Sequence, residues 1–211
     1  MSARRNQNPQ VRKSPPANLR RVSVFCGSRE GIRPSYAQAA EALGRALLHR
    51  GIGLVYGGGG VGMMGRISET VKNGGGEIIG IIPHALLARE VGRQDIGELR
   101  IVRSMHERKA MMVEISDGFV AIPGGLGTFE EFCEIVTWAQ LGLHSKPVGL
   151  LNIDSYFDPL IEQFNRAVTE GFAYPENRAL ILHETNPDRL LDLMESYNPP
   201  RIEQWIDPDE A

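Results

Sequence analysis

Short apolar runs alternate with longer helical patterns along most of the chain, and this alternation is the feature that most limits the possible folds. Several runs are apolar at nearly every position, which is typical of parallel strands buried on both faces of a sheet. We expect strands at Val22–Cys26, Ile52–Tyr56, Ile78–Ile82, Phe119–Ile122, Pro147–Leu151 and Ala179–Leu182, with Ile101-Val102 as a candidate for a short extra strand. The sequence therefore predicts an α/β fold: a doubly wound, Rossmann-like parallel sheet of about six or seven strands with helices on both faces.

Start signals for helices lie between these runs. A Ser or Thr followed three residues later by Glu or Gln has the spacing of a capping box, and Asn-Pro is a common helix start. These signals are Ser35 to Gln38 after Pro34, Ser104 to Glu107, Thr128 to Glu131 before a helix to about Leu141, Asp154 or Ser155, and Asn186-Pro187. The order of strands and helices favours right-handed crossovers, so the Gly-rich segments that follow several strands should meet at one edge of the sheet.

Residues 21–198 contain no linker and no internal repeat, so we expect them to form a single Rossmann-like, nucleotide-binding catalytic domain. Residues 1–20 are rich in Arg, Asn, Gln, Pro and Ser, which predicts a disordered basic tail. Residues 199–211 are expected to form an acidic C-terminal extension, held to the domain by Trp205 and Ile206.

Charge and hydropathy exclude several classes of protein. Five of the 23 basic side chains lie in residues 1–20, which contain no acidic residue, so the rest of the chain has 18 basic against 26 acidic residues. An acidic body argues against a nucleic-acid partner, because such proteins usually present a basic surface. No apolar run approaches the roughly 20 residues that span a bilayer, and the N-terminus lacks the apolar core of a signal peptide. With only Cys26 and Cys133, no disulfide framework is expected, and we predict a cytoplasmic protein with no membrane partner.

Glycine clusters mark the candidate ligand-binding loops, since 24 of the 211 residues are Gly. Gly27 and Ser28 follow the first strand, where a small residue and a hydroxyl suit the approach of a phosphate or ribose. Gly57, Gly58 and Gly59 open a longer run after the second strand, where backbone N–H groups and a helix N-terminus can bind one anion. No Gly-Lys-Ser/Thr follows, so the run is not a P-loop, and a dinucleotide fingerprint at the second strand is disfavoured.

Charged side chains follow in two further segments. The segment Met105–Lys109 places Arg108 and Lys109 at the start of a helix, where cations oppose the helix dipole, and an anionic ligand would explain them. The segment Pro123–Glu131 leads from a buried strand into a helix, and its glycines and Thr128 again offer donors. Glu131 fits the last position of a capping box, so capping and catalysis both remain open, with Glu130 as the other candidate carboxylate.

These segments resemble the LOG ("lonely guy") family of cytokinin riboside 5′-monophosphate phosphoribohydrolases. Pro123–Glu131 has the family pattern PGGxGTxxE, and Met105–Lys109 resembles its M-H-x-R-K segment. Tyr56–Gly59 and Trp138–Gly142 are also similar, and the resemblance covers roughly residues 20–198. Members are often labelled lysine decarboxylases, but nothing in this sequence indicates a pyridoxal-phosphate lysine or a metal site.

The resemblance implies hydrolysis of the N-glycosidic bond of adenosine 5′-monophosphates, including N6-substituted ones, to the free base and ribose 5-phosphate. It assigns the catalytic roles to Arg108 and Glu131. By the same resemblance and the loop argument, the expected substrate-binding residues are Gly27, Ser28, Gly57, Gly58, Gly59, Glu90, Lys109, Gly124, Gly125, Leu126, Gly127, Thr128, Phe129, Glu130 and Thr137. It also implies a homodimer or larger homo-oligomer with the site near the interface.

The histidines lack metal-ligand spacing, so we expect neither a metal nor a cofactor. A non-catalytic nucleotide-binding or carrier module of the same fold is the alternative, since such proteins share Gly-rich loops. The pair Arg108 and Glu131 favours the enzyme, because a protein that only binds nucleotides has no need of both.

Overall fold

The computed structural model describes residues 18–87 and 97–201. Seven parallel strands form one sheet in the order β4-β3-β2-β1-β5-β6-β7. The strands are β1 (Arg21–Phe25), β2 (Gly53–Tyr56), β3 (Ile78–Pro83), β4 (Glu98–Val102), β5 (Gly118–Ala121), β6 (Val148–Leu151) and β7 (Ile181–Glu184). The predicted doubly wound parallel sheet is confirmed, and the order reverses between β1 and β5.

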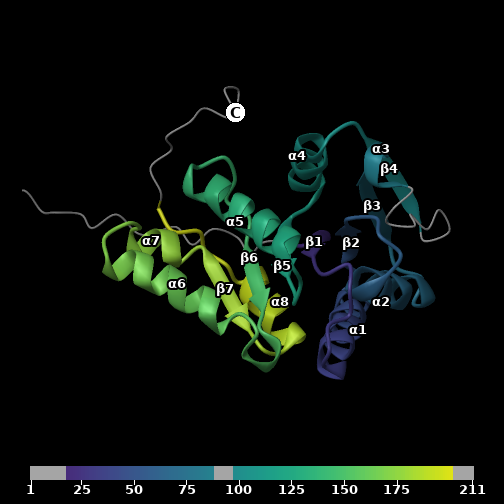
Figure 1. Cartoon of the computed structure of the whole chain (residues 1–211), viewed down its shortest axis with the longest axis horizontal. Coiled ribbons are helices and arrows are strands. Elements are labelled where there is room, and N and C mark those ends of the chain that lie inside the picture. The colour runs from purple at the N-terminus through teal and green to yellow at the C-terminus, as the bar shows by residue number, and fades with distance from the viewer. Residues whose placement is uncertain (1–17, 88–96, 202–211) are drawn as a thin grey trace, which may run out of the picture.

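Helices cover both faces of the sheet (Figure 1). They are α1 (Pro34–His49), α2 (Gly62–Asn73), α3 (His84–Leu87), α4 (Met105–Ile115), α5 (Leu126–Gln140), α6 (Asp158–Thr169), α7 (Pro175–Arg178) and α8 (Pro187–Glu195), with a 3₁₀ turn η1 at Ile153–Ser155. One core cluster packs α1, α2 and α8 against the sheet, and a second packs α4, α5 and α6 against the opposite face. Strand side chains alternate between the two clusters: Val22 and Val24 belong to the first, and Phe25 to the second.

The strand predictions are correct in position and differ mainly at the ends. The candidate strand at Ile101-Val102 is the end of β4, whose charged residues Glu98 and Arg100 hide it from a search for apolar runs. The last strand lies two residues later than expected, because Ala179 and Leu180 still belong to the turn after α7.

Three of the predicted helix starts are wrong. Helix α6 begins at Asp158 with Phe157 as its N-cap, and Asp154 and Ser155 lie in the η1 turn before it. Helix α1 begins at Pro34 with Arg33 as its N-cap, and the Ser35 hydroxyl instead donates to Asp154 at 2.5 Å. Helix α5 begins at Leu126 with Gly125 as its N-cap, so Thr128 lies inside the helix. Ser104 and Asn186 are N-caps as predicted, and each accepts a hydrogen bond from the backbone N–H three residues on.

The chain ends fall partly outside the described residues. Residues 1–17, most of the expected basic tail, and residues 202–211, with Trp205 and Ile206, are among those not described. Leu19 is only 7% exposed and joins the core, and the backbone N–H of Arg20 donates to Asp117 at 2.8 Å. The folded part of the chain therefore includes Leu19 and Arg20.

Candidate active site

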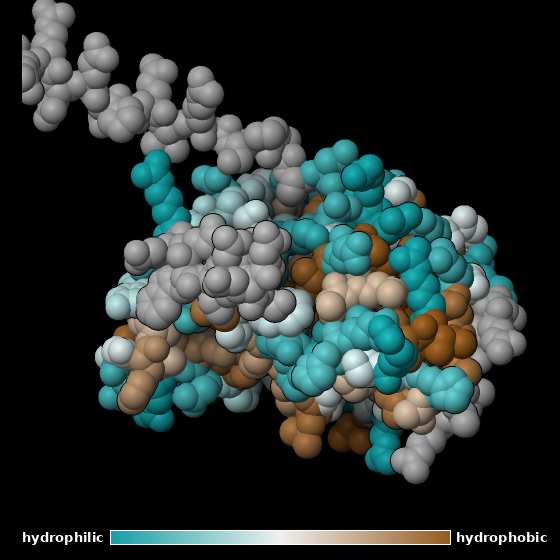
Figure 2. Space-filling view, turned by 90° about the horizontal axis from the view of Figure 1, so that it is seen from above, coloured by the Kyte–Doolittle hydropathy of each residue, from teal (hydrophilic) through white to brown (hydrophobic). Residues whose placement is uncertain are grey.

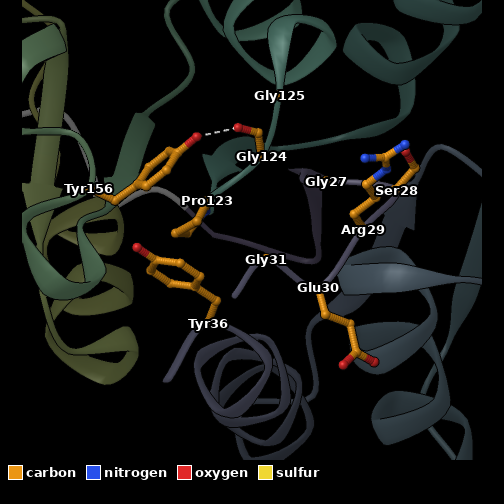
Figure 3. A pocket seen from close by; sticks show the side chains of 10 residues that line it. All are labelled: Gly27, Ser28, Arg29, Glu30, Gly31, Tyr36, Pro123, Gly124, Gly125 and Tyr156. Atoms are coloured by element: carbon orange, nitrogen blue, oxygen red, sulfur yellow. Dashed lines mark hydrogen bonds between the residues drawn. The ribbon is translucent and has the colours of Figure 1, made fainter. Parts of the chain in front are cut away.

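Two cavities open at the carboxyl ends of β1 and β5, where the strand order reverses and ligands of such sheets usually bind. The first, of about 290 Å³, is lined by Arg108, Glu131 and the first turn of α5, and we call it the Arg108 cavity. The second, of about 380 Å³, lies between the β1–α1 loop and Tyr156, and we call it the Tyr156 cavity (Figure 3). Gly27, Ser28 and Gly125 line both, so the cavities share one wall.

A buried ion pair forms the polar end of the Arg108 cavity. Arg108 Nη2 lies 3.0 Å from Glu131 Oε1, and the two residues are only 6% and 7% exposed. The Nε of Arg108 is buried and has no hydrogen-bond partner among the described residues. A buried donor without a partner is costly, so a ligand that accepts from this guanidinium would be strongly favoured.

The position of Glu131 excludes the capping interpretation. Because α5 begins at Leu126, Glu131 lies in the second turn of the helix and its side chain faces Arg108 of α4. The sequence pattern Thr-x-x-Glu is present, but the helix has already begun two residues before Thr128, with Gly125 as its N-cap.

The absence of a side chain at Gly57 leaves room for the Arg108 guanidinium. A Cβ on Gly57 would lie 2.3 Å from Arg108 Nη2 and 3.2 Å from the Met64 sulfur. Gly62, at the start of α2, has φ +63° and lies against the backbone of Ser28, where a Cβ would be 2.3 Å from the Ser28 carbonyl carbon. These glycines thus serve close packing around the site, a role that the sequence pattern does not separate from anion binding.

The first turn of α5 provides the donors of the Arg108 cavity. Gly125, Leu126, Gly127 and Thr128 all line it, and the first N–H groups of a helix have no acceptor within the helix. No side chain caps this helix. Together with the positive end of the helix dipole, these donors form a site suited to a phosphate.

Lys109, a predicted binding residue, is in the lining of neither cavity and pairs with two carboxylates. Its Nζ lies 2.5 Å from Glu130 Oε1 and 2.7 Å from Glu134 Oε2. Burial alone would lower the pKa of Lys109, but the hydrogen bonds and charges of the two carboxylates outweigh it and raise that pKa. The ammonium is therefore charged, and it fixes the Glu130 side chain at the edge of the Arg108 cavity.

Neither cysteine has the properties of a nucleophile. Burial raises the pKa of the Cys26 thiol well above its usual range, and the negative charge of Glu131 raises it further. Burial also raises the pKa of Cys133, which is half-buried in α5. Both side chains are thiols at neutral pH, and nucleophilic attack by cysteine requires the thiolate.

The structure brings most of the predicted site residues together, but not all of them. Gly27, Ser28, Arg108, Glu130 and Glu131 lie around the Arg108 cavity with the first turn of α5. Gly124 lines the Tyr156 cavity, and Gly57, Gly58 and Gly59 are in the lining of neither. Phe129 packs against the rings of Tyr156 and Phe157.

One predicted binding residue lies elsewhere, and another is not described. Thr137 lines a separate cavity beside α6 and donates to the Cys133 carbonyl at 2.7 Å. Glu90 lies outside the described residues. For both, substrate binding stays a prediction.

Sequence reasoning missed part of the apolar wall and the tyrosine of the second cavity. Leu86 and Met105 line the Arg108 cavity with Met64, and an isolated Leu or Met carries no sequence signal for such a place. Tyr156 follows two residues with positive φ, Asp154 at 49° and Ser155 at 60°, which no feature of the sequence predicts.

The described residues contain neither a candidate membrane span nor a candidate metal site. Residues 18–87 and 97–201 contain no helix that is both long and apolar enough to cross a membrane. In the same residues, no group of three or more His, Cys, Asp and Glu side chains is arranged to hold a metal ion.

Comparison with protein families and curated proteins gives consistent matches. A family model described as "Possible lysine decarboxylase" matches residues 64–194. The cytokinin riboside 5′-monophosphate phosphoribohydrolase LOG of Oryza sativa subsp. japonica is 48% identical over 183 residues, which cover 87% of this chain and 76% of the rice protein. LOG7 of Arabidopsis thaliana, with the same enzyme name, is also 48% identical and is covered over 84% of its length.

Solved structures share the fold. A molybdenum cofactor binding protein from Rippkaea orientalis has a TM-score of 0.63 at 25% identity, over 83% of this chain and 95% of that protein. The molybdenum cofactor carrier protein of Chlamydomonas reinhardtii has a TM-score of 0.60 at 17% identity, over 82% of this chain and 96% of the carrier. At 17% identity the second likeness shows the fold alone.

Proposed function

This chain belongs to the LOG family of cytokinin riboside 5′-monophosphate phosphoribohydrolases, and from that premise we propose that it hydrolyses the N-glycosidic bond of N6-substituted adenosine 5′-monophosphates. The products are a free adenine-type base, which is an active cytokinin, and ribose 5-phosphate. The observation that carries the proposal is the buried pair of Arg108 and Glu131 beside the open N-terminus of α5. One cavity thus combines a carboxylate, a guanidinium and a helix N-terminus suited to a phosphate.

The chemistry needs each of these groups. Breaking the bond builds positive charge on the ribose and negative charge on the departing base. The Glu131 carboxylate, near the anomeric carbon, stabilises the first charge and can orient or deprotonate a water molecule. Arg108 cannot act as an acid at neutral pH, so it stabilises the transition state by charge and hydrogen bonds, and its unpartnered Nε supports that role.

The phosphate belongs on the backbone donors of residues 125–128, at the positive end of α5. The base then lies toward Met64, Leu86 and Met105, the apolar wall of the same cavity. Binding energy from the phosphate holds the ribose against Glu131, so it contributes to the rate of cleavage as well as to affinity.

We place the enzyme in the cytoplasm as a homodimer or larger homo-oligomer, with no metal, cofactor, nucleic acid or membrane required. Support for an interface near the site comes from two exposed apolar side chains that line the Arg108 cavity: Leu126 is 86% exposed and Met105 is 38% exposed. Figure 2, which views the molecule from the side of α4 and α5, shows apolar surface among the hydrophilic residues there.

The test compares base release from four substrates at matched high concentration: the nucleoside and its mono-, di- and triphosphate. We expect cleavage of the monophosphate, with poor turnover of the nucleoside even near saturation. The di- and triphosphates should also be poor substrates, because a loop closed around one phosphate leaves little room for a second.

Comparable turnover of nucleoside and monophosphate would contradict both the phosphate site and the proposed reaction. Tight binding of the monophosphate with no release of base would instead support the alternative, a nucleotide-binding or carrier module of the same fold.

A further inference from the structure

We propose that Tyr156 is a positioning residue for the phosphate site, although it does not line the cavity that holds Arg108 and Glu131. Its hydroxyl fixes the peptide group between Gly124 and Gly125, and so aims the N–H of Gly125 at the substrate phosphate. The inference rests on the proposed function and adds to it a residue from the β6–α6 connection, which the family motifs do not include.

The hydroxyl of Tyr156 donates a hydrogen bond to the carbonyl oxygen of Gly124 (Figure 3). The figure shows the phenol ring reaching from the left side of the Tyr156 cavity, above Tyr36, toward the Gly124 carbonyl. The contact joins segments 32 residues apart in the sequence, so it is a tertiary contact of the loop and not part of its local turn.

The geometry of the peptide bond links this hydrogen bond to the Arg108 cavity. In a trans peptide, the C=O of one residue and the N–H of the next point in opposite directions. With the Gly124 carbonyl held by Tyr156, the Gly125 N–H points away from Tyr156. Gly125 lies in the wall that the two cavities share, and the Arg108 cavity lies on its other side.

The loop needs such an anchor because two adjacent glycines have more backbone freedom than any other pair of residues. Close packing limits only part of that freedom: a Cβ on Gly124 would lie 2.1 Å from the Thr128 hydroxyl and 2.8 Å from the Gly27 nitrogen, whereas one on Gly125 would meet nothing within 4 Å. The Gly125 carbonyl accepts a hydrogen bond from the Phe129 N–H at 3.2 Å, on the far side of its Cα, and the hydrogen bond to Gly124 sets the direction of its N–H.

Tyr156 is itself held in place by a strained turn. Asp154 and Ser155 both have positive φ, a conformation that persists only where surrounding contacts enforce it. The Asp154 carboxylate accepts a hydrogen bond from the Ser35 hydroxyl at 2.5 Å and lies 3.7 Å from Arg33 Nη1. The start of α1 thus enforces the turn that presents Tyr156.

Ring contacts fix the direction of the tyrosine. Its ring centroid lies 5.7 Å from that of Tyr36, 5.1 Å from that of Phe157 and 6.3 Å from that of Phe129, which is stacked on it from the first turn of α5. These contacts survive the loss of the hydroxyl, so the variant Tyr156→Phe removes the anchor and keeps the packing.

The experiment measures direct binding of ribose 5-phosphate and of adenine to the full chain by calorimetry, and kcat and KM for the monophosphate. In Tyr156→Phe we expect ribose 5-phosphate to bind about tenfold more weakly, adenine to bind as in the wild type, and KM to rise by a similar factor. Tyr36→Phe is the matched control, because the Tyr36 hydroxyl lines the same cavity but makes no hydrogen bond with the described residues. It should bind both ligands as the wild type does.

A second variant, Ser35→Ala, keeps the tyrosine and loosens the turn, so it should show a smaller loss with the same preference for ribose 5-phosphate. Unchanged binding of ribose 5-phosphate in Tyr156→Phe would overturn the proposal, and so would an equal loss for both ligands, which indicates a merely structural role. A wild-type chain that binds ribose 5-phosphate but releases no base would contradict the proposed function alone.

Discussion

Glu130 and Glu131 are neighbours in the sequence with opposite surroundings. The Glu131 side chain is buried against Arg108, whereas the Glu130 side chain is 51% exposed and paired with Lys109. Residue identity and spacing alone leave the two carboxylates equivalent, because adjacent positions on a helix differ only in the face they occupy. The packing of α4 against α5 separates them, which is why the sequence left capping and catalysis open.

We expect Glu131→Gln to lower kcat for the monophosphate by at least ~10²-fold, since the amide cannot stabilise a cationic ribose or take a proton. The same change leaves Arg108 buried without its carboxylate, so the free energy of unfolding should fall by up to about 3 kcal/mol. Steady-state kinetics and urea unfolding measure the two effects separately.

Glu130→Gln is the control for that change. Its exposed carboxylate should contribute less to both quantities, with less than ~10-fold loss of activity. A larger loss of kcat in Glu130→Gln than in Glu131→Gln would exchange the roles of the two residues.

At the scale of elements, the success of the capping pattern depended on what precedes it. Ser104 and Asn186 each lie directly before the first helical residue and cap their helices. Ser35 and Thr128 instead lie inside helices that have already begun, at Pro34 and Leu126. Strands were predictable from their apolar content because five of them are buried on both faces. Edge strand β4 has charged residues, so only its last two positions gave a signal.

The connection between α5 and β6 contains a histidine whose protonation should affect stability. His144 Nε2 lies 2.9 Å from the Ile135 carbonyl, and its Nδ1 accepts a hydrogen bond from the Lys146 backbone N–H. Burial lowers the pKa of His144; the Ile135 hydrogen bond opposes that shift, and the Lys146 charge adds to it. The folded protein therefore holds this ring neutral at pH values where the unfolded chain protonates it.

The pKa of His144 in the folded protein is below the unfolded value of about 6.5. The contribution of the neutral ring to stability is therefore fully present above that pH, and it is lost as the pH falls toward the folded pKa. Urea unfolding at pH 7.5 and 5.5 should show a larger decrease for the wild type than for His144→Gln. An equal decrease in both proteins would mean that His144 titrates alike in the folded and unfolded states.

At the scale of the whole molecule, the alternation of strands and helices was enough to predict the sheet, the order of its elements along the chain and the edge that carries the site. The meeting of two cavities at one shared wall was not predictable, because it depends on how far the β1–α1 and β5–α5 loops approach each other. That approach is close: the Gly27 N–H donates to the Pro123 carbonyl at 3.3 Å.

Removal of residues 1–17 should leave kcat and KM unchanged, since Leu19 and the contacts of Arg20 and Arg21 with Asp117 remain. Deletion through residue 20 removes the buried Leu19 and two hydrogen bonds of the Arg20 backbone, to Asp117 and to the Gly53 N–H, and should lower the free energy of unfolding by about 2–5 kcal/mol. Thermal unfolding and activity assays of the two truncated chains give the comparison. Loss of activity in the shorter deletion would show that the tail contributes to catalysis.

The central place of β1 also determines when the enzyme becomes active during its own synthesis. Strand β1 pairs with β2 on one side and with β5 on the other, and Val22 is aligned with Gly118, nearly a hundred residues later. Strands β1 to β4 can therefore assemble while the ribosome is still translating α4 and β5, because chains fold from the N-terminus as they emerge. Ser28 belongs to this early half and Glu131 to the late one, so the site exists only once β5 has docked. Until then one edge of β1 has unpaired backbone groups, and an open strand edge can pair with the strand of another chain.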